Sequence, residues 1–526
     1  MSEQSQAEVI AFLSGQMDGA DGSLPRIVRT HGAVILLGTV DAYKIKRAVR
    51  YDYLDFSTLQ KRHDMLSREL ELNRPAAPSI YRDLIAVTRD ADGRLHLGGT
   101  GEVVEWVLRM RRFDAADELG QVAARGALDD RTAAALGEVI AHYHANAPTR
   151  QDMGGAALIG AILDQVHTAF DDMTDVFGAE QISQYRTATD HAWRSARPQM
   201  NARRAAGHIR RCHGDLHLGN IVLTGGVPTL FDALEFNETL GTCDVLYDLA
   251  FLLMDLDHKG LRPAANAVLN AYLFHADCAD HYAALSLLPL FQSLRAAIRG
   301  MVAVQAARAG GEDADDLPQA RNYLSEAIAY LAPPPARLIA VGGQSGTGKS
   351  VLAAALAPQI GAAPGAVHLR SDMERKAFFG LPPLARLPEA AYTPEVGARI
   401  YDIMRSKARR ALLAGHSVVM DATWLDGEER MALDRLAGET GAPFNGLWLV
   451  AGSAILEARV TARRGDASDA DVAVVRKQAD HIHTPADWSV IDASGSRADT
   501  FRQADRILEH PPRRRHGGLM RPQDQN

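Results

Sequence analysis

The first part of the chain alternates apolar and polar positions with the period of a β-strand. The segment AVILLGTVDAYKIKR at residues 33–47 contains two apolar and β-branched runs on either side of a turn, which predicts two neighbouring strands. On the second strand, a period of two places Lys44 and Lys46 on one face. Either lysine could point toward a nucleotide, or both could be solvated on an edge strand.

A helix is predicted directly after these strands. Leucines recur at helical spacing in LQKRHDMLSRELELNR, and Ser57 with Gln60 has the pattern of an N-terminal capping box. Glu69 therefore lies on a helix that follows the lysine strand. The apolar run at 101–113 predicts a further strand, which would correspond to the hinge between two lobes if the domain resembles a kinase.

A proline-rich stretch, LAPPPARLIAVGG, divides the chain, because three consecutive prolines end a helix and favour an extended connector. After it, strand-like and helix-like segments alternate, as in an α/β domain with a parallel sheet. We therefore predict a first domain at 1–332, a linker at 333–337 and a second domain at 338–508. The Pro-, Gly- and charge-rich residues 509–526 are predicted to be a disordered tail.

Composition narrows the class of protein. The chain has 526 residues, of which 47% are apolar and 23% charged, which is the balance of a soluble multidomain protein. The net charge of −8 argues mildly against a general nucleic-acid-coating role. Three cysteines without a CxxC pair predict neither a disulfide framework nor a cysteine-rich zinc site. No signal peptide or membrane-length apolar run is recognised, so we expect a cytoplasmic protein without a membrane partner.

The segment RRCHGDLHLGNIVL at 210–223 sets polar residues between two apolar runs. Asp215 and Asn220 are five residues apart, the interval in the kinase catalytic loop H-R-D-L-x-x-x-N. Phosphoryl transfer needs a carboxylate to accept the proton of the acceptor hydroxyl, and an amide oxygen and a second carboxylate to hold magnesium. A following turn and the strand TLFDALEF should return Asp232 beside Asn220, which makes Asp232 the predicted second metal ligand.

Together, HGD at 213–215, Asn220, Asp232 and DVLYDLAF at 244–251 resemble the aminoglycoside phosphotransferase family, a branch of the protein-kinase-like fold. The resemblance covers roughly the first 330 residues. It implies a two-lobed α+β domain that uses ATP and Mg²⁺, with Asp248 supporting the catalytic loop.

The same resemblance implies a role for each candidate side chain. Asp215 would be the catalytic base, Asn220 and Asp232 would bind magnesium, and Lys44 with Glu69 would position the phosphates. The chain also departs from the kinase pattern, because FDALEF replaces a DFG triplet and no glycine-rich loop precedes the lysines. The choice between Lys44 and Lys46 therefore stays open.

Histidines are expected to have structural roles. We interpret His213 and His217 as packed or capping residues that shape the loop. The pairs AHYH at 141–144 and HIH at 481–483 suggest no third ligand, so we interpret both as ordinary helix or surface histidines.

The strongest motif follows the proline linker. GQSGTGKS fits the P-loop pattern G-x-x-x-x-G-K-[ST], with an apolar strand before it and an Ala/Leu-rich helix after it. Its backbone N–H groups would surround the phosphates of a nucleotide, while Lys349 would reach the β- and γ-phosphates and Ser350 would bind magnesium. The candidate nucleotide contacts are Gly343, Gln344, Ser345, Gly346, Thr347, Gly348, Lys349 and Ser350.

Two carboxylates follow later strands of this domain. Asp372 is predicted to end a strand, with Arg375 one helical turn on, and Asp421 to end a buried strand. Ligands bind beyond the carboxyl ends of strands in open α/β sheets, so one aspartate could be a hydroxyl base and the other a metal-holding carboxylate; alternatively each caps a helix. Arg459 and Arg463 are expected four apart on one helix face, as in a lid that neutralises transition-state charge, or on a solvated face.

These features resemble the small P-loop kinases of the polynucleotide kinase, gluconate kinase and zeta-toxin type, over about 336–505. The resemblance implies that Asp372 activates the acceptor and that Arg375 contacts the substrate.

The sequence thus predicts a protein-kinase-like two-lobe α+β domain followed by an α/β P-loop NTPase domain. The predicted function is ATP- and Mg²⁺-dependent phosphoryl transfer at two nucleotide sites to a hydroxyl acceptor, most simply a small molecule. One alternative is a second domain that acts as a regulatory ATPase switch. Another is a nucleic-acid 5′-hydroxyl kinase, which would need a basic groove with stacking aromatics, whereas the clear basic cluster, Arg513–Arg515, lies in the tail.

Overall fold

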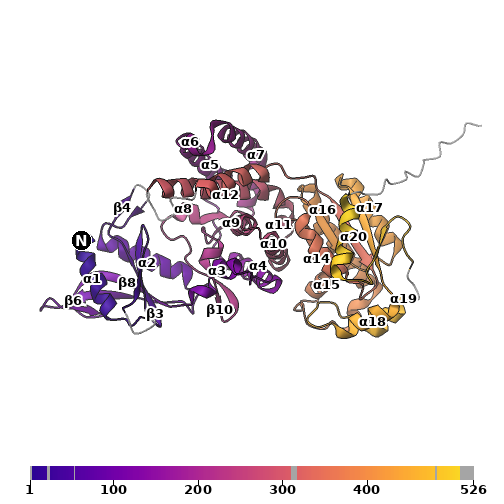
Figure 1. Ribbon diagram of the computed structural model, residues 1–526, viewed down its shortest axis with the longest axis horizontal. Coiled ribbons are helices and arrows are strands. Elements are labelled where there is room, and N and C mark those ends of the chain that lie inside the picture. The colour runs from indigo at the N-terminus through magenta and orange to yellow at the C-terminus, as the bar shows by residue number, and fades with distance from the viewer. Residues whose placement is uncertain (1–2, 20–23, 52–53, 310–316, 480–482, 510–526) are drawn as a thin grey trace, which may run out of the picture. The chain divides into compact units, whose positions relative to one another are not determined.

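The computed structural model describes residues 3–19, 24–51, 54–309, 317–479 and 483–509 (Figure 1). The chain divides into two compact units, one of residues 1–281 with 287–332 and the other of 282–286 with 333–526. Residues 510–526 of the predicted tail, with the basic cluster Arg513–Arg515, and residues 481–482 of the HIH segment lie outside the described residues.

The first unit begins with a six-stranded antiparallel sheet of order β1-β2-β3-β8-β6-β7. Its strands are β1 (Arg26–Arg29), β2 (Ala33–Leu37), β3 (Asp41–Lys46), β6 (Tyr81–Arg89), β7 (Leu95–Leu97) and β8 (Glu102–Arg111). A short antiparallel pair, β4 (Arg50–Tyr51) and β5 (Leu54–Asp55), follows β3 in the chain. Strands β2 and β3 confirm the two strands predicted around the turn at the start of the chain.

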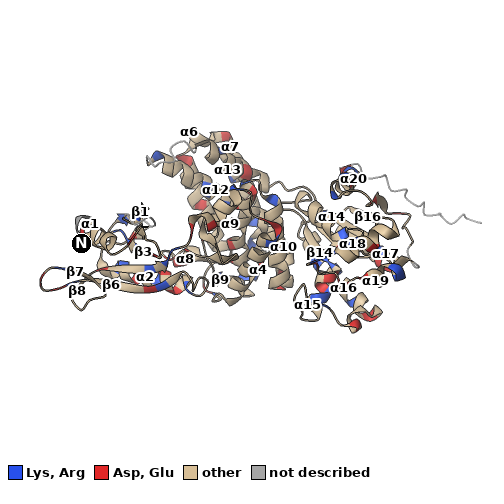
Figure 2. Cartoon of the chain, turned by 60° about the horizontal axis from the view of Figure 1, so that its bottom comes forward, with Lys and Arg blue, Asp and Glu red and all other residues tan. Residues whose placement is uncertain are grey.

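The two faces of this sheet are covered by different helices. Apolar side chains of α1 (Glu3–Gly15) share a core cluster with Tyr43 and Ile45 of β3. The opposite face packs against α2 (Leu59–Asn73), which carries both signs of charge (Figure 2). Because side chains alternate along a strand, the face of β3 that bears the two lysines is turned toward α2.

The rest of the first unit is mainly helical. Helices α9 (Val245–His258) and α12 (Leu288–Arg308) are the most deeply buried, and α4 (Asp130–Asn146) packs along α10 (Arg262–Ala276). The described stretch 279–308 is long and apolar enough to cross a membrane, but 67% of its most apolar window is buried in the protein. The remaining helices are α3 (Leu119–Ala124), α5 (Gly155–Asp171), α6 (Thr174–Phe177), α7 (Ala179–Ala205), α8 (Glu238–Gly241), α11 (Ala279–Ala283) and α13 (Leu317–Tyr330).

Two small antiparallel ladders frame the predicted catalytic loop. Strand β9 (Ile209–Arg211) pairs with β12 (Thr242–Asp244), and β10 (Ile221–Thr224) pairs with β11 (Val227–Leu230). The loop from Cys212 to Asn220 connects β9 to β10, so both of its ends are fixed by backbone pairing.

The second unit has a five-stranded, all-parallel sheet of order β14-β15-β13-β16-β17. Its strands are β13 (Leu338–Gly343), β14 (Val367–Arg370), β15 (Val418–Asp421), β16 (Phe444–Val450) and β17 (Ser489–Asp492). Helices α14 (Lys349–Leu356) and α20 (Arg497–Glu509) bury apolar side chains against its central strands. The remaining helices are α15 (Ser371–Phe378), α16 (Pro394–Leu413), α17 (Gly427–Thr440), α18 (Ser453–Ala462) and α19 (Val472–Ala479). This architecture confirms the predicted α/β P-loop fold.

The predicted N-cap of α2 was wrong by one residue. The Ser57 hydroxyl bonds instead to the Asp55 carboxylate at 2.6 Å, so Thr58 becomes the N-cap and accepts the Lys61 N–H at 3.2 Å. Competition from a neighbouring carboxylate therefore moved the cap.

Two boundaries in the second unit also differ from prediction. Strand β14 ends at Arg370, so Asp372 lies in the first turn of α15 and not at a strand end. Helix α18 ends at Ala462, and Arg463 has extended backbone with φ −61° and ψ 135°. Arg459 and Arg463 are therefore not on one helix face.

Candidate active sites

The lysine strand meets the buried carboxylate predicted to be its partner. Lys44 Nζ donates to Glu69 Oε1 at 2.7 Å and to Asp232 Oδ1 at 2.8 Å. Lys46 Nζ donates to Glu69 Oε2 at 2.6 Å and to Glu235 Oε1 at 2.6 Å. Each lysine takes one oxygen of Glu69, whose side chain is completely buried. Lys44 is thus the one that reaches the predicted metal ligand.

Electrostatics keep this pair ionised. Desolvation disfavours the charged form of Lys44, but the charges of Asp232 and Glu69 outweigh it and raise the lysine pKa well above its usual value. Desolvation also opposes ionisation of Asp232, yet the charge and hydrogen bond of Lys44 lower the pKa of this carboxyl overall. The free protein therefore holds an ammonium directly on a carboxylate.

The predicted catalytic loop brings Asp215 and Asn220 together. Asn220 Nδ2 donates to both the backbone oxygen and Oδ2 of Asp215, at 2.9 Å each. With its amide nitrogen used in this way, Asn220 has its Oδ1 left to accept a cation. The Asp215 side chain is 42% exposed, so an acceptor hydroxyl can reach it.

His217 contacts the predicted base. Gly219 N–H donates to its Nδ1 at 3.1 Å, which leaves Nε2 to donate toward Asp215 Oδ2 at 3.4 Å. Burial raises the pKa of Asp215, but the hydrogen bond and charge of His217, with the charges of His213 and Arg295, lower it to about 2. The expectation that His217 only shapes the loop therefore missed its contact with the carboxylate.

Asp232 is fixed next to the loop by backbone bonds. Phe231 N–H donates to the Asn220 oxygen at 3.0 Å, and His213 Nε2 lies 2.9 Å from the Phe231 oxygen. Asp232 N–H donates to the Tyr81 hydroxyl at 3.1 Å. Asp232 has φ 60°, a left-handed conformation that costs a non-glycine residue about 1 kcal/mol or more and is found where the surroundings impose it.

Two carboxylates of α9 accept backbone hydrogen bonds from this loop. Asp248 accepts the backbone N–H of His213 at 3.2 Å and of Gly214 at 2.7 Å. Asp255 accepts the backbone N–H of Leu218 at 2.9 Å. Asp248 is thus placed where the family resemblance implies a loop-supporting residue, whereas Asp255 was not anticipated.

Sequence reasoning also missed Arg295 of α12. Its guanidinium packs over the rings of Tyr247 and Phe251, with 4.0 and 4.8 Å to the centroids, and its charge contributes to the lowered pKa of Asp215 and Asp248. The sequence did contain a signal, which is an arginine inside the apolar run LPLFQSLRAAI. A buried guanidinium needs a counter-charge, so this position indicates a carboxylate nearby.

The P-loop of the second unit follows β13 and leads into α14. Gly343, Gly346 and Gly348 have φ of 130°, 87° and 92°, which L side chains rarely adopt. A Cβ on Gly343 would also lie 2.4 Å from the Leu449 oxygen. Lys349 Nζ donates to the Gln344 oxygen at 2.9 Å, so the lysine is folded back over its own loop.

A cavity of about 1510 Å³ opens over this loop. It is large enough for a nucleotide together with a small acceptor. Gly343 and Gln344 do not line it. The predicted residues that do are Ser345, Gly346, Thr347, Gly348, Lys349, Ser350, Asp372, Arg375, Asp421, Arg459 and Arg463.

The two aspartates of this cavity differ in electrostatics. Burial and the Asp421 charge raise the pKa of Asp372 more than Lys349 and Arg370 lower it. Burial raises the pKa of Asp421 as well, but the hydrogen bond of His368 and the charges of Arg370, His368 and Lys349 lower it overall. Neighbouring carboxylates with opposite pKa shifts are typical of an acid–base group beside an electrostatic or metal-holding one.

The predicted arginines lie on the cavity wall. Arg375 Nη1 donates to the Ala391 oxygen at 2.7 Å, and its guanidinium is 5.4 Å from the Tyr392 ring. Arg459 Nη2 donates to the Gly495 oxygen at 3.2 Å. Both retain further N–H groups for a bound anion, because a guanidinium carries five.

Comparisons with known proteins match the two parts of the chain to different families. Residues 93–288 match the family described as "Phosphotransferase enzyme family", and residues 338–485 match the one described as "AAA domain". The chain is therefore a fusion of a domain similar to the phosphotransferase enzyme family with a P-loop NTPase domain, which indicates a phosphotransferase.

Relatives extend over nearly the whole chain. "Uncharacterized protein Rv2004c" of Mycobacterium tuberculosis (strain ATCC 25618 / H37Rv) is 29% identical over 491 residues, which are 91% of this chain and 94% of the relative. "Uncharacterized protein Mb2027c" of Mycobacterium bovis (strain ATCC BAA-935 / AF2122/97) has the same identity and coverage.

Solved structures are similar to parts of this chain. A gluconokinase from Sinorhizobium meliloti 1021 is 21% identical, with a TM-score of 0.24, over 33% of this chain and 94% of that chain. A choline/ethanolamine kinase family protein from Mesorhizobium loti is 13% identical, with a TM-score of 0.34, over 62% and 99%. Aminoglycoside 2′-phosphotransferase-IIIa is 14% identical, with a TM-score of 0.36, over 61% and 98%.

Proposed function

We propose that both units bind ATP with Mg²⁺ and that each transfers the γ-phosphoryl group to a hydroxyl acceptor. The observation that carries the proposal is the convergence of Asp215, Asn220, Asp232 and Lys44 in the first unit, from segments far apart in the sequence. Carboxylate and amide oxygens are the ligands that Mg²⁺ prefers, so this set of donors fits the ion.

In the first unit, Asp215 orients the acceptor hydroxyl and accepts its proton, since its lowered pKa keeps it ionised. Asn220 Oδ1 and Asp232 would hold magnesium, which would neutralise charge on the phosphates. Lys44, kept in place by Glu69, would contact the phosphate oxygens.

In the second unit, the backbone of the P-loop and Lys349 bind the phosphates. Asp372 serves as the base, because its raised pKa makes it the more basic of the two aspartates in the cavity, and Asp421 with Ser350 would hold magnesium. Arg375, Arg459 and Arg463 contribute positive charge around the transferred group. A base in the cavity favours a kinase over a regulatory ATPase switch, which needs no acceptor base.

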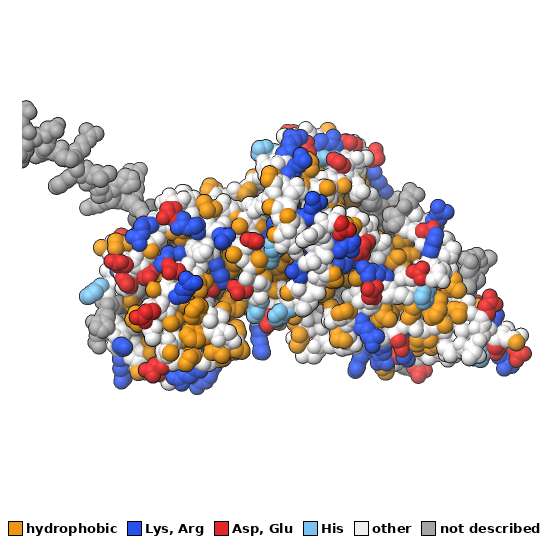
Figure 3. All heavy atoms as spheres, turned by 180° about the vertical axis from the view of Figure 1, so that it is seen from behind, with side chains coloured by type: hydrophobic (Ala, Val, Ile, Leu, Met, Phe, Trp, Pro, Cys, Tyr) orange, Lys and Arg blue, Asp and Glu red, His pale blue; other side chains and the backbone are white. Residues whose placement is uncertain are grey.

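We propose small hydroxyl compounds as acceptors and a cytoplasmic location. Figure 3 shows basic side chains mixed with acidic ones over the visible face, which does not favour a nucleic-acid groove. The described cysteines, Cys212, Cys243 and Cys278, are free thiols, as is usual in a reducing compartment.

The test is ADP formation by the full chain against a panel of hydroxyl acceptors that includes aminoglycosides, sugars, small alcohols and 5′-hydroxyl oligonucleotides. Asp215→Asn should abolish turnover with acceptors of the first unit, and Lys349→Ala with acceptors of the second. Exposed Asp92→Asn and Arg435→Ala are the matched controls and should keep full activity. Acceptor-independent turnover lost in Lys349→Ala alone would refute the second kinase site and support the switch.

A further inference from the structure

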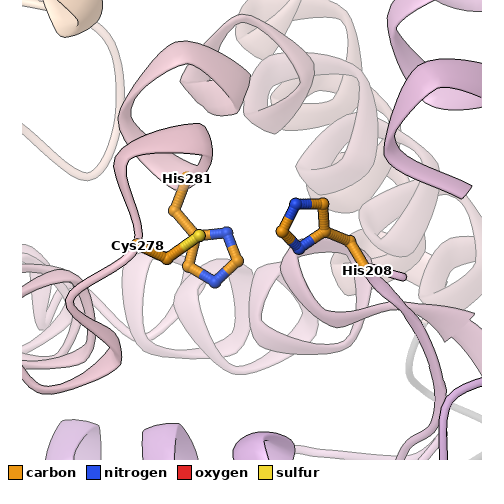
Figure 4. Close-up of side chains that lie close together, drawn as sticks. All are labelled: His208, Cys278 and His281. Carbon is orange, nitrogen blue, oxygen red and sulfur yellow. The ribbon is translucent and has the colours of Figure 1, made fainter. Parts of the chain in front are cut away.

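Three side chains of metal-ligand type converge in the first unit, away from the catalytic loop residues. His208 follows α7 and precedes β9, while Cys278 and His281 flank the start of α11. One ligand atom from each lies within 4.8 Å of those of the other two. Figure 4 shows the two imidazole rings facing each other, with the Cys278 side chain on the His281 side.

His281 has an unmet ring nitrogen at this place. The residue is 6% exposed, and its Nδ1 has no hydrogen-bond partner among the residues that the structure describes. Its ring centroid lies 5.2 Å from that of His208. Buried polar atoms nearly always have a partner, so an unsatisfied nitrogen aimed into a cluster of donors indicates a missing one.

His208 is oriented as a metal-binding histidine usually is. Its Nε2 lies 3.4 Å from Oδ2 of Asp280, and a carboxylate on one ring nitrogen leaves the other for a metal. Asp280 stands between the two other members in the sequence Cys278-Ala-Asp280-His281. One short turn therefore supplies two ligands and the group that orients the third.

We propose that His208, Cys278 and His281 bind a Zn²⁺ ion. Two imidazole nitrogens and one thiolate suit this borderline-soft ion, which is tetrahedral and would take water as a fourth ligand. Mg²⁺ prefers oxygen ligands, so the ion is different from the one proposed at the phosphates. Binding would release the thiol proton of Cys278.

Two other clusters of ligand-type residues give weaker support for a metal site. His144, Cys212 and Asp248 are buried together, but His144 and Asp248 already bond to each other at 3.1 Å, and Asp248 also holds the catalytic loop. Glu138, His142 and His275 supply the third ligand that the sequence did not suggest, yet all three are at least partly exposed.

The proposed zinc site lies next to the strand that leads into the predicted catalytic loop. His208 leads directly into β9, and this strand leads into the loop that ends at Asn220. The His208 oxygen also accepts the Val245 N–H, at 3.2 Å, where α9 begins. Zinc would tie the start of β9 to α11 and so add a fixed point behind the catalytic loop.

Cobalt is the probe for the thiolate. The full chain, stripped with a chelator and titrated with Co²⁺, should take up one equivalent with the intense near-ultraviolet absorption of a thiolate–cobalt bond. Cys278→Ser should lose this absorption while keeping the circular dichroism of the wild type, and His142→Gln should retain it. Absence of the band from wild type, or its persistence in Cys278→Ser, would overturn the site.

Affinity for Zn²⁺ provides a second measurement, made by competition with a chromophoric chelator. Asp280→Asn should weaken binding about 10- to 100-fold, as loss of an orienting carboxylate does. Cys278→Ser should weaken it more, and Zn²⁺ should raise the melting temperature of wild type but not of this variant. Equal affinity in wild type, Asp280→Asn and Cys278→Ser would contradict the proposal.

Discussion

Two lysines on one strand divide their tasks through the partners that they reach. Both bind Glu69, but only Lys44 contacts Asp232, whereas Lys46 contacts Glu235. The sequence predicts that both lie on one face, because that depends on the period of a strand. It cannot choose between them, because the choice depends on a carboxylate 188 residues away.

Lys44→Met should lower phosphoryl transfer by the first unit at least about 100-fold, because it removes a preorganised charge from the phosphates. Lys46→Met should leave most of the activity but lower the free energy of unfolding by about 3 kcal/mol, because it leaves Glu235 buried without its partner. Steady-state kinetics and urea melts distinguish the two. Equal loss of activity in both variants would contradict the assignment of Lys44.

The two proposed bases should respond differently to acid. The pKa of Asp215 is lowered to about 2, so this carboxylate stays ionised well below neutral pH, whereas the pKa of Asp372 is raised. As the pH falls, Asp372 is protonated before Asp215. The kcat/KM of the second unit should therefore decline, whereas protonation of Asp215 should not lower the kcat/KM of the first unit over the same pH range.

This pH dependence is measured in the full chain, with Lys349→Ala reporting the first unit and Asp215→Asn the second. The decline of the second unit should occur above the ordinary carboxyl value of about 4. A flat acid limb for the second unit would argue against Asp372 as its base.

At the scale of elements, the P-loop depends on glycines for its backbone shape. Gly348 has φ 92° and open space around its Cα, so an added Cβ meets no neighbour and strains only the backbone. Gly348→Ala should therefore reduce nucleotide binding by the second unit about 5- to 30-fold, since about 1–2 kcal/mol of strain opposes the bound shape.

Gly397 of α16 is the matched control for this change. A Cβ added at Gly397 would also meet no described atom within 4 Å outside its own helix turn, but this residue lies inside a helix. Gly397→Ala should leave nucleotide binding unchanged and stabilise the second unit by about 0.4–1 kcal/mol. Isothermal titration and melting curves of the two variants give the comparison, and equal binding by both would show that the loop does not need this conformation.

Elements with strong periodicity were predicted well, and their ends were not. Strands β2, β3 and β13 follow from local apolar patterns, and the P-loop follows from a motif with a strand before it and a helix after it. The N-cap at Thr58 and the end of α18 before Arg463 depend on local competition for hydrogen bonds and on tertiary packing.

At the scale of the whole molecule, each unit has its own core and its own candidate nucleotide site. The fusion was predictable from two unrelated motifs and three prolines. The supports of the catalytic loop were not, because Asp255 and Arg295 come from helices whose partners are distant in the sequence.

Nucleotide should protect the two units separately. At 100 times its dissociation constant, Mg²⁺·ATP should stabilise each unit by about 2.7 kcal/mol. Hydrogen exchange followed by mass spectrometry should show slower exchange in both cores of wild type. Lys349→Ala should lose the protection in the second unit alone, and Lys44→Met in the first alone. Protection of only one unit in wild type would exclude two nucleotide sites.

The ion pair between Lys44 and Asp232 bears on the order in which ligands arrive. Lys44 belongs to strand β3, and Asp232 follows β11 beside the catalytic loop, so the ammonium already occupies a carboxylate proposed for magnesium. A free divalent ion would have to compete with this built-in counter-ion for Asp232, and Lys44 would keep only Glu69 as its partner. A nucleotide supplies phosphate oxygens to which the ammonium can move, so the metal should enter together with the nucleotide and leave the empty enzyme poorly loaded with metal.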